Sequence, residues 1–291
     1  MTASMLDDAG LRARKARSAL ATGFIVLSFV VMLVPLVMIV GYVVSRGAKV
    51  ISWSFLTGDL PIIDRIQGGI GPAIVGTLLI TGAATLMAVP LGILGGIYLN
   101  EYGGRRRTAR VVRFLADVLT GVPSIVMGLF VYAIWTLRFK NLSAFGGALA
   151  LACLMLPIVI RTTEEVLRLV PADQREASYA LGGRKATTIR RVVMPSAVPG
   201  VTSGALLAIA RAAGETAPLL FTIGAVTSTN TSLFHGSNTA LSVLIFRNAT
   251  SPFVVAQDRA WGAALTLIVI VFVFTLLARV VSARFDRRRH A

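Results

Sequence analysis

The chain is dominated by long runs of apolar residues separated by short polar segments. A bilayer core about 30 Å thick is crossed by about 20 predominantly apolar residues in a helix. Six stretches have about that length, and one of them carries charges near its centre. The pattern predicts an all-α integral membrane protein with six transmembrane helices. The predicted spans are 20–45, 71–99, 115–137, 141–160, 197–223 and 260–281.

Composition and charge support this class and orient it. The chain is 55% hydrophobic and 14% charged, with a mean hydropathy of +0.77, which excludes an ordinary soluble protein. Arg211 apart, 21 lysines and arginines lie in the segments on one side of the six spans and 7 on the other. The positive-inside rule then predicts that both termini are cytoplasmic. The same rule accounts for most of the net charge of +16, so we expect no nucleic-acid partner.

Several local features refine the predicted spans. Gly92 and Gly96 form a GxxxG pair that lets another helix approach closely. Pro123 predicts a kink or an unwound turn within the third span, at a place that faces protein or water. The apolar run 241–246 is too short to cross a bilayer and is typical of an interfacial or re-entrant segment. The first span follows basic residues, but it is too long for a cleaved signal and is predicted to be a retained anchor.

The segment 173–195 has the pattern of a polar hairpin between the fourth and fifth spans. Its apolar residues recur at helical spacing in two short groups, which predicts two amphipathic helices. Gly182 falls where a helix end needs a left-handed residue, and Pro195 is expected to end the second helix before the fifth span begins. The apolar face of the hairpin must be buried, either on the membrane surface or against a partner protein, and periodicity leaves both open.

The hairpin also resembles a known sequence pattern. Glu176, Ala177, Gly182, Val192 and Pro195 match EAA-x3-G-x9-I-x-L-P, the pattern of permeases of ATP-binding-cassette (ABC) importers, with mild departures. The resemblance implies that this hairpin is a coupling element that inserts into a groove of a nucleotide-binding subunit. These five residues are then the expected contacts with that subunit.

Four further stretches resemble one branch of that family. These stretches occur in the same order as in the phosphate-specific permeases, which they resemble. The sequence GETAPLL favours the PstA-type over the PstC-type subunit. The resemblance implies a type I ABC importer permease fold in the bacterial plasma membrane. It implies as partners a PstC-type sister permease, two ATP-binding subunits and an extracytoplasmic phosphate-binding protein that docks on two external loops. The four stretches are 68–81, 120–128, 156–165 and 210–222, and the docking loops are 46–70 and 224–259.

We also expect a particular order of segments along the chain and the hydrolysis of ATP by a different subunit. No G-x-x-x-x-G-K-[ST] phosphate loop occurs, so ATP is expected to be hydrolysed by another polypeptide and this chain to be a non-catalytic subunit without a cofactor. Its one cysteine and two histidines show no metal-ligand spacing. The expected segments are a cytoplasmic tail 1–19, a first helix 20–45, an external loop 46–67, a permease domain 68–282 and a basic tail 283–291.

Two charged constellations are candidates for the substrate pathway. Arg211 lies near the middle of the fifth span, where a charge is costly unless it faces the bundle interior or water, and its guanidinium fork can hold two phosphate oxygens. Glu215, one turn further on, can neutralise Arg211 when the pathway is empty; the alternative is a self-contained pair that only cancels charge. Arg161 and Glu164, at the end of the fourth span, suit either a helix anchor or the pathway, and the family resemblance favours the pathway.

Three other functions stay open at this point. The first is a permease for another oxyanion, and the second is a secondary anion transporter working alone, which would not need the hairpin. The third is an intramembrane enzyme that uses Glu215 as an acid or base, for which further polar groups should converge in the same span. The sequence shows neither a second catalytic carboxylate there nor a nucleophile with a base at matching spacing.

Overall fold

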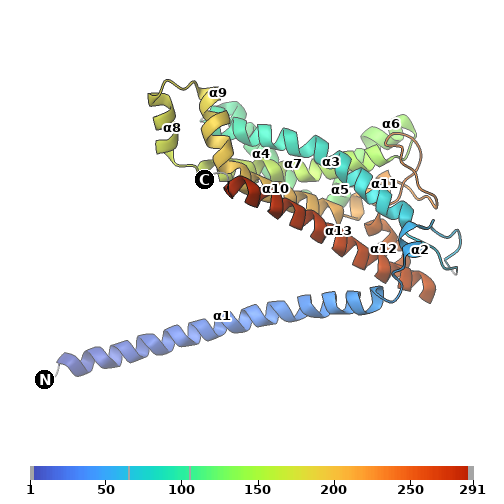
Figure 1. Cartoon of the computed structure of the whole chain (residues 1–291), viewed down its shortest axis with the longest axis horizontal. Coiled ribbons are helices and arrows are strands. Elements are labelled where there is room, and N and C mark those ends of the chain that lie inside the picture. The colour runs from blue at the N-terminus through green and yellow to red at the C-terminus, as the bar shows by residue number, and fades with distance from the viewer. Residues whose placement is uncertain (1–2, 65, 105, 288–291) are drawn as a thin grey trace.

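The computed structural model describes residues 3–64, 66–104 and 106–287, and every regular element in these ranges is a helix. Four long helices run side by side and form an elongated bundle (Figure 1). One end of the bundle carries a helical hairpin and the last turns of α13; we call it the hairpin end. The opposite end carries the longer loops and is the loop end. The four helices are α3 (Gly71–Ile97), α7 (Ala144–Arg168), α10 (Met194–Ala213) and α13 (Val254–Arg287).

The tightest contact in the bundle joins α3 and α7. A Cβ atom added at Gly92 would lie 2.7 Å from the Val159 side chain, and one at Gly96 would lie 2.5 Å from Thr163. Both glycines are therefore required for the close approach, which confirms the prediction from the GxxxG pair. Because lipid tails are as apolar as the core side chains, this contact is stabilised by van der Waals packing rather than by removal of water.

Within the described residues, five helices are long and apolar enough to cross a membrane, and there are six if one bent pair counts as a single span. The bent pair corresponds to the predicted third span 115–137. Helix α4 (Arg107–Gly121) ends before Val122, and α5 (Ser124–Val131) starts after Pro123 at an angle of 106°. Proline lacks the N–H of a helical residue and disfavours helix in the residue before it, so the predicted break is confirmed at Pro123. Helix α5 continues through η2 (Tyr132–Thr136) into α6 (Leu137–Phe139).

The fifth predicted span differs from expectation at both ends. A continuous helix runs from Lys185 to Ala213, so the prediction that Pro195 ends a separate hairpin helix is wrong. The π-helical turn just before Pro195 bonds the Met194 N–H to the carbonyl of Ile189, and this shifted pattern lets the helix continue through a residue without an N–H. The elements of this helix are α9 (Lys185–Thr188), η3 (Ile189–Val193) and α10.

At its other end the predicted fifth span is interrupted. Helix α10 stops at Ala213, residues 214–216 are not helical, and α11 (Ala217–Thr222) follows. The nearby α12 (Leu241–Ala249) is too short to span, as predicted, and its first residues are buried in the protein. The Leu241 N–H donates to Thr77 Oγ1 at 2.8 Å, and Ser242 Oγ donates to the Glu215 carbonyl at 2.8 Å. Interrupted backbone at membrane depth is tolerated where such partners exist.

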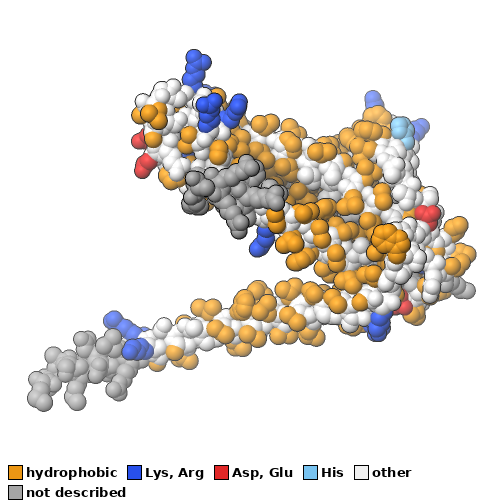
Figure 2. Space-filling model, viewed as in Figure 1, with side chains coloured by type: hydrophobic (Ala, Val, Ile, Leu, Met, Phe, Trp, Pro, Cys, Tyr) orange, Lys and Arg blue, Asp and Glu red, His pale blue; other side chains and the backbone are white. Residues whose placement is uncertain are grey.

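Helix α1 (Ala3–Gly47) stands apart from the bundle (Figure 1). It contacts α13 near the loop end, where the rings of Tyr42 and Trp261 lie 5.0 Å apart. Figure 2 shows a nearly continuous apolar surface along its free length. Its first described turns continue the helix back to Ala3, so the segment predicted as a tail, 1–19, is largely helical. The predicted loop 46–67 contains the short α2 (Trp53–Thr57).

Candidate functional site

The hairpin predicted from the EAA-type pattern is present at one end of the bundle (Figure 1). Helix α8 (Ala172–Ala180) has no buried residue, and it turns into α9 through Gly182, whose φ of 79° lies in the left-handed region that glycine adopts without strain. Glu176, Ala177 and Gly182 are exposed, as is Pro195, whereas Val192 is half-buried. The hairpin therefore presents most of the predicted contact residues on its surface.

The surface of the hairpin also carries apolar groups that the described part of the chain leaves exposed. Leu181 at the turn is 90% exposed and Tyr179 is 43% exposed. An apolar tip on an otherwise polar projection is typical of a docking surface, because a monomeric protein gains nothing by leaving it in water.

The charged pair of the interrupted fifth span lies halfway along the bundle. Arg211 is in the last turn of α10, and Glu215 lies in the break beyond it, so the prediction that both are on one face of a single helix is wrong. The two still meet: Arg211 Nε is 3.7 Å from Glu215 Oε1. The pair adjoins Leu154 and Ile158, near the middle of α7, although Arg211 lies in the last turn of α10 rather than at the middle of a span.

This pair is loose on the side of the arginine. A distance of 3.7 Å is longer than a hydrogen bond, and among the described residues Glu215 is the one ion-pair partner of Arg211. The Arg211 side chain is 70% exposed, while that of Glu215 is 19% exposed. The guanidinium consequently keeps most of its donors available on a face that the described residues leave exposed.

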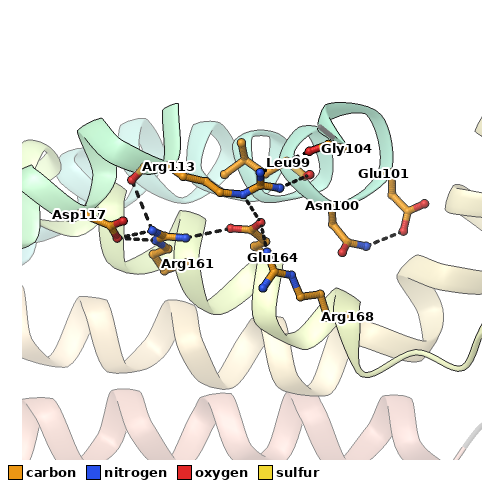
Figure 3. A network of polar contacts seen from close by, with 9 residues as sticks. All are labelled: Leu99, Asn100, Glu101, Gly104, Arg113, Asp117, Arg161, Glu164 and Arg168. Atoms are coloured by element: carbon orange, nitrogen blue, oxygen red, sulfur yellow. Dashed lines mark hydrogen bonds and ion pairs between the residues drawn. The ribbon is translucent and has the colours of Figure 1, made fainter. Parts of the chain in front are cut away.

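A second charged group, which we call the glutamate cluster, lies towards the hairpin end (Figure 3). The Glu164 side chain is 1% exposed, so its charge needs compensation. Three guanidinium groups supply it, with two hydrogen bonds shorter than 2.8 Å and one at 3.2 Å. The donors are Arg113 Nε at 2.7 Å, Arg168 Nη2 at 2.6 Å and Arg161 Nη1 at 3.2 Å.

The glutamate cluster joins helices that are far apart in the sequence. Arg161 on α7 also donates from Nε to Asp117 Oδ1 on α4 at 2.9 Å, and Arg113 on α4 donates from Nη2 to the Leu99 carbonyl at 2.9 Å. The predicted site residues Arg161 and Glu164 are thus brought together. Their contacts, however, hold α4 against α7, and Arg211 and Glu215 lie elsewhere.

Sequence reasoning missed three members of this cluster. Arg113 precedes the third predicted span and Asp117 lies near its start. Their spacing of four residues would place both on one face of a helix, and this spacing was the available signal. Arg168 lies one turn beyond Glu164 and could have been found by the same spacing. Glu165, the neighbour of Glu164 in the sequence, is exposed and takes no part in the cluster. The described residues include no group of three potential metal ligands among His, Cys, Asp and Glu.

Together, the helical bundle, the charged break at mid-depth and the projecting hairpin define a multi-pass membrane permease with a docking element. Residues 88–291 match the family of binding-protein-dependent transport system inner membrane components. The chain belongs to this family, and within it to the PstA-type permeases of the inner membrane.

Individual relatives agree with this assignment. The chain is 47% identical, over 95% of its length and 92% of the relative's, to phosphate transport system permease protein PstA 1 of Mycobacterium tuberculosis (strain CDC 1551 / Oshkosh). It is 46% identical to PstA of Mycobacterium leprae (strain TN), over 89% of this chain and 86% of that protein. The fold resembles a solved bacterial ABC transporter involved in alginate import, with a TM-score of 0.62 at 14% identity, covering 94% of this chain and 98% of that one.

Proposed function

We propose that this chain is the permease subunit of an ATP-driven importer of inorganic phosphate and forms half of the translocation pathway. The observation that carries the proposal is the mid-depth Arg211, which keeps its donors free in a chain whose relatives are named phosphate transport permeases. The exposed hairpin supports coupling to a separate ATPase, since a transporter working alone has no use for it.

Arg211 is suited to a doubly charged oxyanion in transit. A guanidinium is always charged and presents a planar fork that matches two phosphate oxygens. Glu215 opposes it at 3.7 Å, close enough to balance its charge in an empty pathway and too far to occupy its donors. The helix is interrupted between them, and discontinuous helices at this depth form the substrate sites of other transporters.

The proposed partners follow from the faces that the chain leaves open. The hairpin end would be cytoplasmic and would receive one of two ATP-binding subunits through Glu176, Ala177 and Gly182. A PstC-type sister permease would cover the exposed side of Arg211 and complete the pathway. A phosphate-binding protein would dock at the loop end on segments 46–70 and 224–259.

For Arg161 and Glu164 the predicted pathway role stays a prediction. Their contacts support a structural role first, because Glu164 is enclosed by guanidinium groups of its own chain. Arg161 remains 27% exposed and is the member that could also face a passing anion.

The pathway role of Arg211 is tested with two variants. We expect Arg211→Gln to abolish or severely reduce uptake of radiolabelled phosphate while the amount of assembled complex is unchanged, because glutamine keeps hydrogen bonding but loses the charge. If the pair only cancels charge, the double variant Arg211→Gln with Glu215→Gln leaves no uncompensated charge and should transport normally. Recovery of transport in the double variant would therefore defeat the proposal.

The coupling role of the hairpin is tested at its turn. We expect Gly182→Asp to leave the protein in the membrane but to detach or uncouple its ATPase, since aspartate strains a backbone with φ of 79° and adds a charge to the apolar tip. The measurement is co-purification of the ATPase together with phosphate uptake. Normal association with normal uptake would remove the coupling assignment.

A further inference from the structure

The short π-helical segment η1 (Tyr98–Gly103), which continues α3 at the hairpin end, contacts both arms of the hairpin. From the first arm, Arg175 Nη2 donates to Glu101 Oε1 at 3.0 Å. From the second arm, Lys185 Nζ lies 4.8 Å from the centre of the Tyr102 ring, within the range of a cation–π contact. Two adjacent residues of η1 are therefore held by the two arms of one projecting element.

The Arg175–Glu101 contact is partly buried and has further partners. The side chains of Arg175 and Glu101 are 19% and 6% exposed. Arg175 also donates to the carbonyls of Val170 at 2.6 Å and Leu167 at 2.9 Å, which satisfies the end of α7. Glu101 accepts a second hydrogen bond from Asn100 at 2.8 Å. Because separating a desolvated ion pair is costly, η1 should follow the hairpin when the hairpin moves.

The other side of η1 is attached to α4. Tyr98 and Thr108 share a hydrogen bond of 2.7 Å between their hydroxyl groups, and Arg113 donates to the Leu99 carbonyl at 2.9 Å. Arg113 in turn binds Glu164 of α7 in the glutamate cluster (Figure 3). Segment η1 is thus joined by side-chain contacts to the hairpin on one side and to α4 on the other.

Beyond α4 the contacts reach the interrupted fifth span. The 106° bend at Pro123 leads into α5, where a Cβ atom at Gly128 would lie 2.5 Å from Pro218 Cα in α11. Pro218 lies just after the break that contains Glu215. A displacement of η1 can therefore reach the Arg211–Glu215 pair through packed helices.

We propose that η1 receives the movement of the hairpin, with Glu101 and Tyr102 as positioning residues that transmit it to α4. The inference rests on the proposed function of the chain as an ATP-coupled permease. π-Helical turns are frequent at functional positions, and this one is fixed by side chains from two elements. If η1 transmits this movement, Glu101 and Arg175 have a coupling energy that a double-mutant cycle measures.

The test uses the complete transporter reconstituted in liposomes with its binding protein. Phosphate uptake and binding-protein-stimulated ATP hydrolysis are measured together, and the ratio of phosphate carried to ATP hydrolysed is the readout. In Glu101→Ala we expect this ratio to fall about tenfold, within the usual range of coupling between sites, while assembly and hydrolysis persist. The double variant Glu101→Ala with Arg175→Ala should fall no further than the more impaired single variant.

Matched variants separate transmission from simple loss of structure. Tyr102→Phe keeps the ring and should transport normally, whereas Tyr102→Leu should lower the ratio; because Tyr102 is 43% exposed, neither change threatens folding. Arg190→Ala removes a charge from an exposed position of the same hairpin and serves as the control.

Two results would overturn the proposal: an unchanged ratio in Tyr102→Leu, or a parallel fall of uptake and hydrolysis in Glu101→Ala. The unmodified transporter tests the proposed function independently. If it carries no phosphate, the functional assignment fails before η1 is considered.

Discussion

The two charged groups of this chain are built in opposite ways. In the glutamate cluster a carboxylate that is 1% exposed has three guanidinium partners from its own chain. In the mid-depth pair an arginine that is 70% exposed has one carboxylate at 3.7 Å. The first arrangement is complete within the chain, and the second is not.

Structural and functional charges in a membrane protein differ in where their partners come from. Ionisable groups in apolar surroundings are expensive, and they persist when they stabilise the fold or when they serve a ligand. A group with all its partners supplied locally is explained by the fold. A group whose donors stay free on an uncovered face needs a partner from outside, either an ion or a neighbouring subunit.

The largest effect is expected at the centre of the glutamate cluster. Glu164→Ala leaves three guanidinium groups without their buried anion, and such a loss typically costs about 3–5 kcal/mol. We expect a lower yield and a lower Tm of the detergent-solubilised protein. Glu165→Ala, which removes the adjacent exposed carboxylate, should change stability by about 0.5 kcal/mol or less. Equal Tm values for the two variants would show that the cluster is not structural.

An intermediate effect is expected at Arg113. Arg113→Gln removes one of three donors to Glu164 and the donor to the Leu99 carbonyl, but it leaves two guanidinium groups on the carboxylate. We expect a loss of about 1–3 kcal/mol, less than for Glu164→Ala. Thermal unfolding of both single variants and of the double variant gives the coupling. Strictly additive losses would contradict a shared network.

The smallest effect on stability is expected at the mid-depth pair. Glu215→Gln should change stability by about 1 kcal/mol or less, because its ion pair is long and its partner is largely exposed. The same thermal assay checks this value. A loss as large as that of Glu164→Ala would show that the Arg211–Glu215 pair is as structural as the glutamate cluster.

The sequence predicts the class and the long elements well because their signals are local. Apolar run length locates the helices, and the Gly92–Gly96 spacing correctly predicts where a neighbour approaches. The turn at Gly182 and the break at Pro123 are also predicted, since each depends on the backbone preference of one residue.

The errors arise where tertiary contacts override a local rule. Pro195 does not end its helix because a π-helical turn redirects the hydrogen bonds before it. The break after Ala213 has no proline at the interruption itself, and it is stabilised from α12, whose Ser242 binds the Glu215 carbonyl. The glutamate cluster joins residues about 50 positions apart, so spacing along one helix could show only part of it.

The free length of α1 has a consequence for the bilayer around it. Its apolar part from Leu20 to Val44 is about 37 Å long at 1.5 Å per residue, which exceeds a hydrocarbon core of about 30 Å. Such a hydrophobic mismatch is relieved by tilting the helix or by thickening the membrane locally. Because α1 is attached to α13 near Tyr42, its opposite end can change its tilt with membrane thickness while the packing of α3 against α7 stays undisturbed.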